Sequence, residues 1–586
     1  METLRNLGRS PIGLNLPAFG ILLVVFGIPI VRLFLASLNA PAFSLINYQA
    51  FFGEPSNVRV LFQTIEMSVT ATAICLIIGY PTAFLIVAAS AQVRTALIVL
   101  TMITYLTSAL VRTYAWVVIL GDRGLINNLM LDLGLISIPL PLVYNRMAVY
   151  IGMVHIMLPL MILSLVSVML GVDKSLMAAA RSMGARPLAA FWRAFLPLSL
   201  PGVRSGSLLV FIICLGFYIT PAALGGLRDA MLATFIAAQV ESSFDMAQIG
   251  ASAFILLGIA GALSILGLDP SSAQPSPKSW CRRLRSIGAL KRIVHEFSAP
   301  RRAKRWTAQL YQAGGESRLP KIVGTMFVTL VMFYLLLPGV IVIVMSFSAG
   351  RFLEFPPSGF SLQWYHSFFS DPSWYGAAWI SMQIGVGVAI LSTTVGTLAA
   401  FGLSRAVPRL RGFLTMVILT PITIPSIVVA VGTYLGLIKL GLIGSKPGIV
   451  LAHSIGSIGY VVVIVSATLS NLDPRLEQAA KSMRAGPLQT FTRVTLPLIR
   501  PGVIGGAVLA FIHSFDEVII TSLVSGFAIR TLPLKMWENM RHEIDPTIAA
   551  VASLLTLLPV LWLIALYVTW WRSRPEGPRA LPNLAK

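Results

Sequence analysis

The sequence predicts an all-α integral membrane protein, with about twelve transmembrane helices arranged as two related halves of six. Composition is the first reason: 56% of the residues are hydrophobic and only 11% are charged, whereas soluble domains carry about 25% charged residues. The second is that apolar runs of roughly 20 residues, the length that spans a bilayer, recur along the whole chain. The third is an internal repeat: a polar stretch near residue 180 returns 300 residues later.

The apolar runs divide into two sets of six. The first set lies near 14–37, 64–89, 96–120, 147–170, 204–224 and 247–268. The second set lies near 321–348, 376–403, 412–439, 448–470, 503–525 and 547–571. We therefore divide the chain into a first half (1–268), a linker (269–320) and a second half (321–586). Both halves have the same predicted orientation, so the repeat is parallel, with an axis along the membrane normal.

The net charge of +22 comes largely from loops and the linker rather than from the spans. Between residues 278 and 318 eleven Lys or Arg stand against two Glu. Basic loops face the cytoplasm, so both termini, the linker and both copies of the repeated stretch are expected on that side. We interpret the linker as a tether beside anionic lipid, with a partner-binding role as the alternative, and expect no nucleic-acid binding. The first apolar run is longer than a signal-peptide core, which favours a retained first span.

The repeated stretch reads AARSMGARPLAAFWRAFLPLSLPGV at 179–203 and AAKSMRAGPLQTFTRVTLPLIRPGV at 479–503, with 15 of 25 positions identical. Its alanines favour a helix, Gly184 suits a left-handed helix end, and Pro187 suits the first turn of the next helix. Pro197 and Pro201 are expected to interrupt the helix before span five, because proline has no N–H to donate. The pattern predicts a short helical hairpin in each cytoplasmic loop, 171–203 and 471–503.

This pattern resembles the EAA loop of ABC importer permeases, which in that family is the coupling helix that docks on the ATPase subunit. The resemblance places ATPase coupling on both copies: Ala179, Ala180, Gly184, Ala185, Phe191, Leu196, Pro197 and Pro201, and Ala479, Ala480, Arg484, Ala485, Phe491, Leu496, Pro497 and Pro501. The family's Glu is replaced by Ala178 and Gln478, with Glu477 one residue early, and its Gly is Arg484 in the second copy.

The chain has no Gly-Lys dipeptide and hence no phosphate-binding loop of the G-x-x-x-x-G-K-[ST] type. The resemblance therefore implies a permease, not an enzyme, with ATP and Mg bound by two copies of a separate cytoplasmic ATPase and with a soluble solute-binding protein outside. No cofactor is expected in this chain. Cys75, Cys214 and Cys281 form no paired framework, so we expect neither disulfides nor a metal site.

Longer stretches resemble the spermidine/putrescine branch of these importers. The first half contributes TSALVRTYAWVVILGDRGLIN and GFYITPAALGG, and the second contributes LTPITIPSIVVAVG, SFDEVIITSLVSG and EIDPTIAAV. The protein thus resembles two permease subunits fused in one chain of a bacterial inner membrane. The implied substrate is a small cation such as a polyamine. Another amine, a small organic solute or ferric ion is the alternative within the same class.

Ionisable residues inside spans are costly and often functional. Asp516 and Glu517 lie in span eleven, with His513 close before them, whereas the equivalent place in the first half carries Phe217 and Tyr218. Two interpretations stay open: a carboxylate that meets a cationic substrate, or a His–carboxylate cluster that only locks the span. The aromatic faces of Phe217 and Tyr218 would attract a cation. We therefore place five residues on the candidate substrate pathway: Asp516, Glu517, His513, Phe217 and Tyr218.

Two other classes compete with this reading. A major-facilitator-type secondary transporter also has twelve spans, but its signature loop between spans two and three is here only ASAQVRTAL. A non-transporting membrane scaffold is supported by the basic linker alone.

Overall fold

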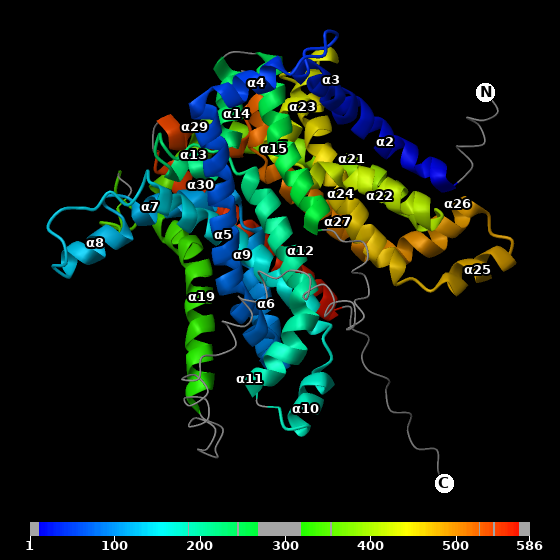
Figure 1. Cartoon of the computed structure of the whole chain (residues 1–586), viewed down its shortest axis with the longest axis horizontal. Helices are drawn as coiled ribbons and strands as arrows, with labels where there is room; N and C mark the ends of the chain where they lie inside the picture. The colour runs from blue at the N-terminus through cyan, green and yellow to red at the C-terminus, as the bar shows by residue number, and fades with distance from the viewer. Residues whose placement is uncertain are drawn as a thin grey trace.

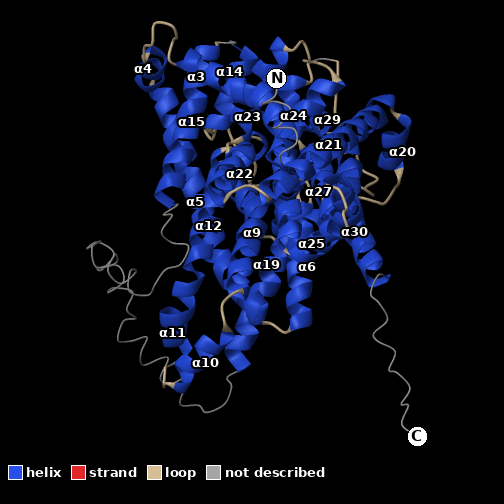
Figure 2. Ribbon diagram, turned by 90° about the vertical axis from the view of Figure 1, so that its right-hand side faces the viewer, coloured by secondary structure: helices blue, strands red, loops and turns tan. Residues whose placement is uncertain are grey.

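The computed structural model describes residues 11–185, 187–242, 245–267, 318–351, 354–526, 528–542 and 545–572. In these residues helices joined by loops form the whole body (Figures 1 and 2). The only β-structure there is an isolated bridge between Ser348 and Phe360. Almost the entire predicted linker, through residue 317, lies outside the described residues.

The first half runs from a short 3-10 turn to α15. Its elements are η1 (Pro11–Asn15), α2 (Leu16–Leu22), η2 (Leu23–Gly27), α3 (Ile28–Ser37), α4 (Ile46–Gly53), α5 (Pro55–Ala88), α6 (Ala91–Leu106), α7 (Ala109–Leu120), α8 (Leu125–Asp132), α9 (Arg146–Leu170), α10 (Lys174–Ser182), α11 (Pro187–Ala190), η3 (Phe191–Phe195), α12 (Leu196–Leu215), α13 (Ile219–Leu224), α14 (Leu232–Ser242) and α15 (Met246–Gly267).

The second half repeats this order. Its elements are α19 (Arg318–Met345), α20 (Gln363–Ser370), α21 (Pro372–Ser404), α22 (Pro408–Thr423), α23 (Ser426–Lys439), α24 (Lys446–Ser470), α25 (Pro474–Ser482), α26 (Pro487–Thr490), η5 (Phe491–Thr495), α27 (Leu496–Asp516), α28 (Ile519–Val524), α29 (Leu532–His542) and α30 (Thr547–Arg572).

The helices confirm an all-α membrane protein. Eight helices among the described residues are long and apolar enough to cross a membrane, and ten are if each of two bent pairs counts as one span. Two shorter apolar helices, Met246–Ala262 and Thr547–Leu561, occupy the predicted sixth and twelfth positions. The predicted spans therefore all fall on helices, although the number that cross a bilayer is established only as eight to ten.

The central helix of each half shows how the sequence sets a span. Asn145 caps α9 by accepting the Ala148 N–H at 3.0 Å, and Ser445 caps α24 by accepting the Gly448 N–H at 3.2 Å. Each cap is followed by a 25-residue helix. At about 1.5 Å per residue, such a helix exceeds the roughly 30 Å hydrocarbon layer.

Predicted spans three and nine each fall on two helices that meet at a sharp bend, which the apolar pattern did not predict. The pair α6 and α7 bends by 91° and the pair α22 and α23 bends by 102°. At the first break Ser108 leaves the helical conformation and its hydroxyl caps α7 by accepting the Val111 N–H. At the second, Pro425 forces the preceding Ile424 into an extended conformation with ψ 140°.

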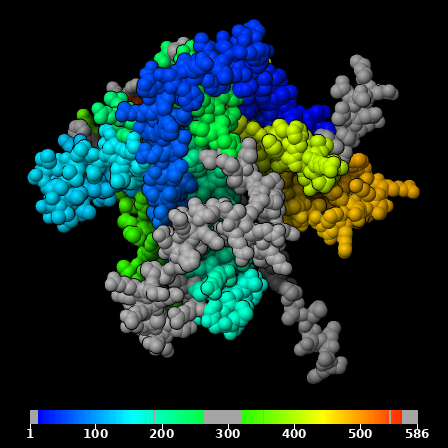
Figure 3. Space-filling view, viewed as in Figure 1, coloured from blue at the N-terminus to red at the C-terminus, as the bar shows by residue number. Residues whose placement is uncertain are grey.

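The first span of each half packs on the other half. In Figures 1 and 3 the N-terminal helices α2 and η2 lie against the second half, beside α21, α22 and α23. Conversely, α19 packs on α5, α6, α7 and α9, and its Tyr334 hydroxyl donates to the Ile151 carbonyl of α9 at 2.8 Å. The main core cluster accordingly contains residues from both halves, so the two halves form one packed body.

Close packing of α21 on α24 depends on Gly396, where an added Cβ would lie 2.8 Å from Val461 Cβ. We predict that Gly396→Leu destabilises the protein by about 1–3 kcal/mol, because the added side chain overpacks this contact. Gly376→Leu in the same helix is the control, since a Cβ there meets nothing within 4 Å. Thermal unfolding in detergent should show a lower midpoint for Gly396→Leu only; equal midpoints would contradict this packing argument.

Candidate functional site

Both repeated stretches form the predicted helical hairpins. Two residues after the end of α10 lies Gly184 with φ +84°, and two residues after the end of α25 lies Arg484 with φ +62°. Asp173 and Asp473 cap the two helices by accepting the Ser175 and Arg475 N–H groups at 2.8 and 2.9 Å. The bond from Ser175 holds the pKa of Asp173 below its ordinary value. Figure 1 shows the hairpins at separate corners of the molecule, both away from α13, α14 and α29.

The hairpins end differently from the prediction. Pro197 and Pro201 do not interrupt the helix, and neither do Pro497 and Pro501: α12 and α27 continue through them. A π-helical turn precedes each, in which the Leu196 N–H reaches the Phe191 carbonyl and the Leu496 N–H reaches the Phe491 carbonyl. This wider turn shifts the backbone hydrogen bonds by one residue just before Pro197 and Pro497, which have no N–H to donate.

The predicted coupling residues separate into an outer and an inner group. Ala179, Gly184, Ala479 and Arg484 are exposed, and Ala180, Ala185, Ala480 and Ala485 are half-buried. Phe191 and Phe491 instead face the body, where they pack on Phe84 and Phe401 with ring centroids 5.3 and 4.7 Å apart. Each hairpin also exposes a leucine and a methionine at matched positions, Leu176 with Met183 and Leu476 with Met483; the methionines are 81% and 82% exposed. The outer surface of each hairpin thus repeats a small alanine, a leucine and a methionine among exposed polar and basic residues such as Arg181 and Lys481.

Asp516 and Glu517 have different surroundings. Asp516 ends α27 and accepts hydrogen bonds from the Ser108 hydroxyl and, at 3.3 Å, from the Ala109 N–H. Glu517 accepts the Ile520 N–H at 2.9 Å at the start of α28. Asp516 therefore joins the second half to the break between α6 and α7 in the first half, and Glu517 caps a helix of its own half.

The equivalent contact, from the end of α12 in the first half to the broken span of the second half, involves a glycine. Gly216 matches Asp516 in the repeat, and it lies against Pro425 at the break between α22 and α23. A Cβ at Gly216 would be 3.0 Å from Pro425 Cβ and 3.1 Å from its Cα. Each fifth span thus ends on the broken span of the opposite half, and only one of these two contacts has room for a carboxylate.

The His513 ring packs on Tyr460, with centroids 5.1 Å apart, and abuts Gly456. It interacts electrostatically with Asp516, but among the described residues no hydrogen bond joins it to either acid. The histidine that locks this region is His453, which sequence reasoning missed. It is 1% exposed and bridges Ser514 and Thr521 at 2.9 Å each. The sequence signal that could have identified it is a histidine within an otherwise apolar predicted span.

A second missed residue is Arg112, inside α7 and only 6% exposed. Its guanidinium donates to the Ile156 carbonyl at 3.2 Å and interacts electrostatically with Asp516. With His155 it lines a cavity of about 140 Å³ between α7, α9 and α19. This buried cation lies beside the carboxylate that was predicted to meet a cationic substrate.

The largest described cavity between the halves lies elsewhere. It has a volume of about 360 Å³ and is lined by Tyr218 and Glu241 from the first half and by Trp537, Glu538, Arg530 and Arg541, among others, from the second. The Tyr218 and Trp537 rings are 5.6 Å apart. Phe217 is half-buried against the core and is not among the lining residues. Of the predicted pathway residues, only Tyr218 faces this cavity.

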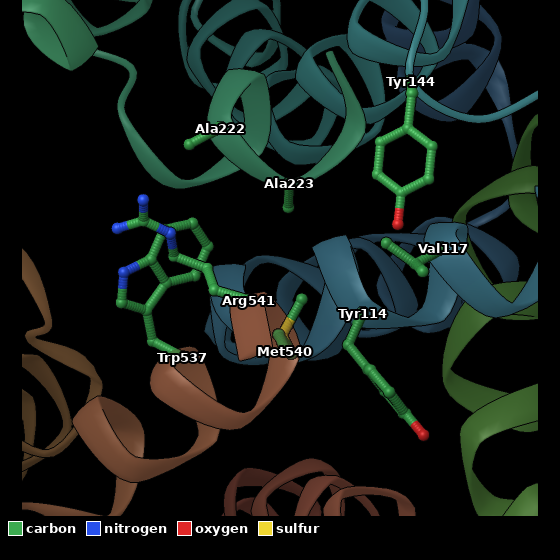
Figure 4. Close-up of a pocket in the computed structure, with 8 residues that line it drawn as sticks. All are labelled: Tyr114, Val117, Tyr144, Ala222, Ala223, Trp537, Met540 and Arg541. Atoms are coloured by element: carbon green, nitrogen blue, oxygen red, sulfur yellow. The ribbon is translucent and has the colours of Figure 1, made fainter. Parts of the chain in front are cut away.

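A neighbouring cavity of about 150 Å³ shares Trp537 and Arg541 with the first one. Figure 4 shows the residues that line it, which are Tyr114, Val117, Tyr144, Ala222 and Ala223 of the first half and Trp537, Met540 and Arg541 of the second. The Arg541 guanidinium carbon lies 5.8 Å from the Trp537 ring centroid, and Arg530 pairs with Glu538 at 3.4 Å. The two cavities together offer aromatic faces with charges of both signs at the interface of the halves.

Residues 392–572 match the family model described as "Binding-protein-dependent transport system inner membrane component". The spermidine/putrescine transport system permease protein PotB of Haemophilus influenzae is 36% identical over 190 residues, 32% of this chain and 66% of that protein. PotB of Escherichia coli is 33% identical over 39% of this chain and 83% of its own length. PotC of Escherichia coli, also named a spermidine/putrescine permease, is 31% identical over 41% of this chain and 90% of its own length. Each relative is thus about half as long as this chain.

The inter-half bond at Asp516 predicts a stability effect. Asp516→Ala should lower the free energy of unfolding by about 1–3 kcal/mol, because it leaves the Ala109 N–H and the Ser108 hydroxyl without their acceptor. Glu517→Gln should change it little, since the amide oxygen can still accept the Ile520 N–H. Thermal unfolding of the detergent-solubilised chain measures both, and a smaller loss for Asp516→Ala than for Glu517→Gln would contradict the assignment.

Proposed function

The chain belongs to the family of binding-protein-dependent transport system inner membrane components, and from that premise we propose that it forms both permease halves of an importer for small cationic amines. The family membership makes it a multi-pass inner-membrane permease of an ABC importer. The substrate class, the ATPase stoichiometry and the placement of both termini in the cytoplasm belong to the proposal.

One observation carries the proposal of a complete two-half permease: the doubled hairpin. Two hairpins of the same shape end in left-handed residues at equivalent positions, and each exposes the same pair of apolar side chains. A permease that works with two ATPase copies needs two such docking surfaces. Relatives named as single permease proteins are about half as long as this chain, which supports one fused chain with two ATPases and one solute-binding protein.

Amine import is supported by the names of the relatives and by the larger cavity. Tyr218 and Trp537 present aromatic faces, and Glu241 and Glu538 present carboxylates, between the halves and away from the hairpins. Aromatic faces and carboxylates are the groups that bind ammonium ions. The guanidinium groups of Arg530 and Arg541 in the same cavity favour a second candidate, an amine that also carries an anionic group.

The docking role of the hairpins predicts a loss of assembly. Ala179→Arg together with Ala479→Arg should sharply reduce co-purification of the ATPase and abolish uptake, because a long charged side chain replaces a small exposed one on each docking surface. Ala91→Arg, also exposed and on the same side of the predicted topology, is the control. Undiminished ATPase association of the double variant would rule out this docking assignment.

The cavity predicts substrate selectivity. In vesicles that contain the chain, its ATPase and its binding protein, ATP-driven uptake of labelled putrescine or spermidine should exceed uptake of a neutral comparator. Tyr218→Leu and Glu241→Gln should each lower amine uptake about 5- to 30-fold, as loss of a cation–π or ionic contact of about 1–2 kcal/mol implies.

The comparison of substrates separates the candidates. If wild-type chain takes up a carboxylated amine but neither polyamine, the second candidate replaces the first. If it takes up only the neutral comparator, the amine assignment is wrong.

A further inference from the structure

The two hairpins, although alike in backbone, are fastened to the body by different chemistry. Phe84 and Phe401 are equivalent in the repeat, since each packs on the phenylalanine that starts a π-helical turn, Phe191 or Phe491. Four residues after these phenylalanines stand Ala88 in the first half and Arg405 in the second. This difference, together with two more in the hairpins themselves, changes how each hairpin is held.

The second hairpin is held by charge. Glu477 on α25 receives the Arg405 guanidinium at 2.7 Å on Oε1 and 2.6 Å on Oε2. Thr495, fully buried in η5, donates its hydroxyl to Glu477 Oε1 at 2.6 Å. The guanidinium also lies 3.4 Å from the Phe401 ring centroid. We call Glu477, Arg405 and Thr495 the ionic anchor.

The first hairpin is held by apolar contact. Met177, Ala88 and Phe195 occupy the positions of Glu477, Arg405 and Thr495. Phe195 packs on Phe84, with ring centroids 5.1 Å apart, and stacks on Phe191, while Met177 packs against the core. We call Met177, Phe84, Phe191 and Phe195 the aromatic anchor.

The ion pair has the geometry of a strong contact. The side chains of Arg405 and Glu477 are only 25% and 15% exposed, so water and salt screen them less than an open surface pair. Removing the carboxylate leaves a guanidinium and a buried hydroxyl without their acceptor, which costs more than the loss of an exposed pair.

We propose that Glu477 is a positioning residue that holds the second coupling hairpin through the ionic anchor, so that the attachment of this hairpin depends on charge and that of the first hairpin does not. In this arrangement the carboxylate is turned toward the body of the permease, and it sets where the exposed surface of α25 stands. The proposal on ATPase coupling rests on the proposed function, whereas the anchor itself is a property of the chain alone.

The charge state of Glu477 follows from its neighbours. Burial raises its pKa, but the hydrogen bonds from Thr495 and Arg405 and the charges of Arg405 and Lys481 outweigh burial and hold the pKa below its ordinary value. The resulting stabilisation is present at neutral pH and is lost as the pH falls through the lowered pKa, below the ordinary glutamate value of about 4.3. At neutral pH the ionic anchor is charged, so a substitution that removes the charge is the direct probe, and high salt acts more weakly on this half-buried pair.

Hydrogen exchange on the full chain in lipid nanodiscs tests the anchor without any partner. Glu477→Gln, which keeps an acceptor for Thr495 but removes the charge, should speed exchange in residues 474–485 about tenfold and leave 174–185 unchanged. Raising the salt concentration from about 0.1 M to about 1 M shortens the Debye length from about 10 Å to about 3 Å. This should also speed hydrogen exchange in the second hairpin of the wild-type chain. Equal responses of the two hairpins, or no response to Glu477→Gln, would overturn the proposal.

The first half supplies the matched control. The triple variant Glu477→Met, Arg405→Ala and Thr495→Phe copies the aromatic anchor into the second half. It should regain the slow exchange of wild type and lose the salt dependence. Continued fast exchange in this variant, with the rest of the chain protected as in wild type, would count against the anchor assignment.

ATP hydrolysis by the assembled transporter separates positioning from direct contact. Glu477→Gln should lower binding-protein-stimulated hydrolysis several-fold without changing the unstimulated rate, and the triple variant should restore it. If the triple variant regains slow exchange but not stimulated hydrolysis, Glu477 contacts the ATPase itself and the positioning role is wrong. If wild type shows no stimulated hydrolysis at all, the proposed function fails, while the exchange experiment still decides the anchor.

Discussion

The crossing of each first span onto the opposite half is the contact on which the rest of the structure depends. The helices α2 to α3 cross α23 at two glycines: a Cβ at Gly432 would meet Ile30 at 2.9 Å, and one at Gly436 would meet the Val25 carbonyl at 2.6 Å. Lipid tails are as apolar as the side chains, so helices in a bilayer associate through close packing rather than through the hydrophobic effect. Two small residues on one face of α23 supply that packing and hold the halves as one body.

A second set of contacts between the halves follows from the first. With the halves held together, the end of α27 meets the α6–α7 break and the end of α12 meets the α22–α23 break. A broken span exposes backbone groups that lipid cannot satisfy. At the first break Asp516 accepts the Ala109 N–H, and at the second Pro425 has no N–H to satisfy. Of the two equivalent positions, Asp516 therefore supplies an acceptor for a free N–H, whereas Gly216 packs closely on a proline that has no N–H.

Hydrophobic run length and the repeat were enough to predict the helices, the two halves and the hairpins, because these features depend on local pattern. The breaks in spans three and nine were missed because Ser108 and Pro425 sit within apolar runs, where a single polar residue or proline is also compatible with a straight helix. The surroundings of Asp516 were beyond sequence reasoning, since Ser108 lies 408 positions away. The cavity residues Glu241 and Trp537 were missed for the same reason: they lie on α14 and α29, in different halves, and line one cavity only in the folded chain.

Equivalent positions can differ because the two halves have different sequences. When two identical subunits form a dimer, every contact between them occurs twice with the same side chains, so a carboxylate suited to one break would also be forced against the other. A single chain that carries both halves removes this constraint, because the two partners are always the correct pair. The differences between Asp516 and Gly216, and between Arg405 and Ala88, are then independent solutions at two sites that share only their backbone. One interface joins the halves through a charged group and the other through close packing, while both hairpins keep an exposed alanine, leucine and methionine at equivalent positions.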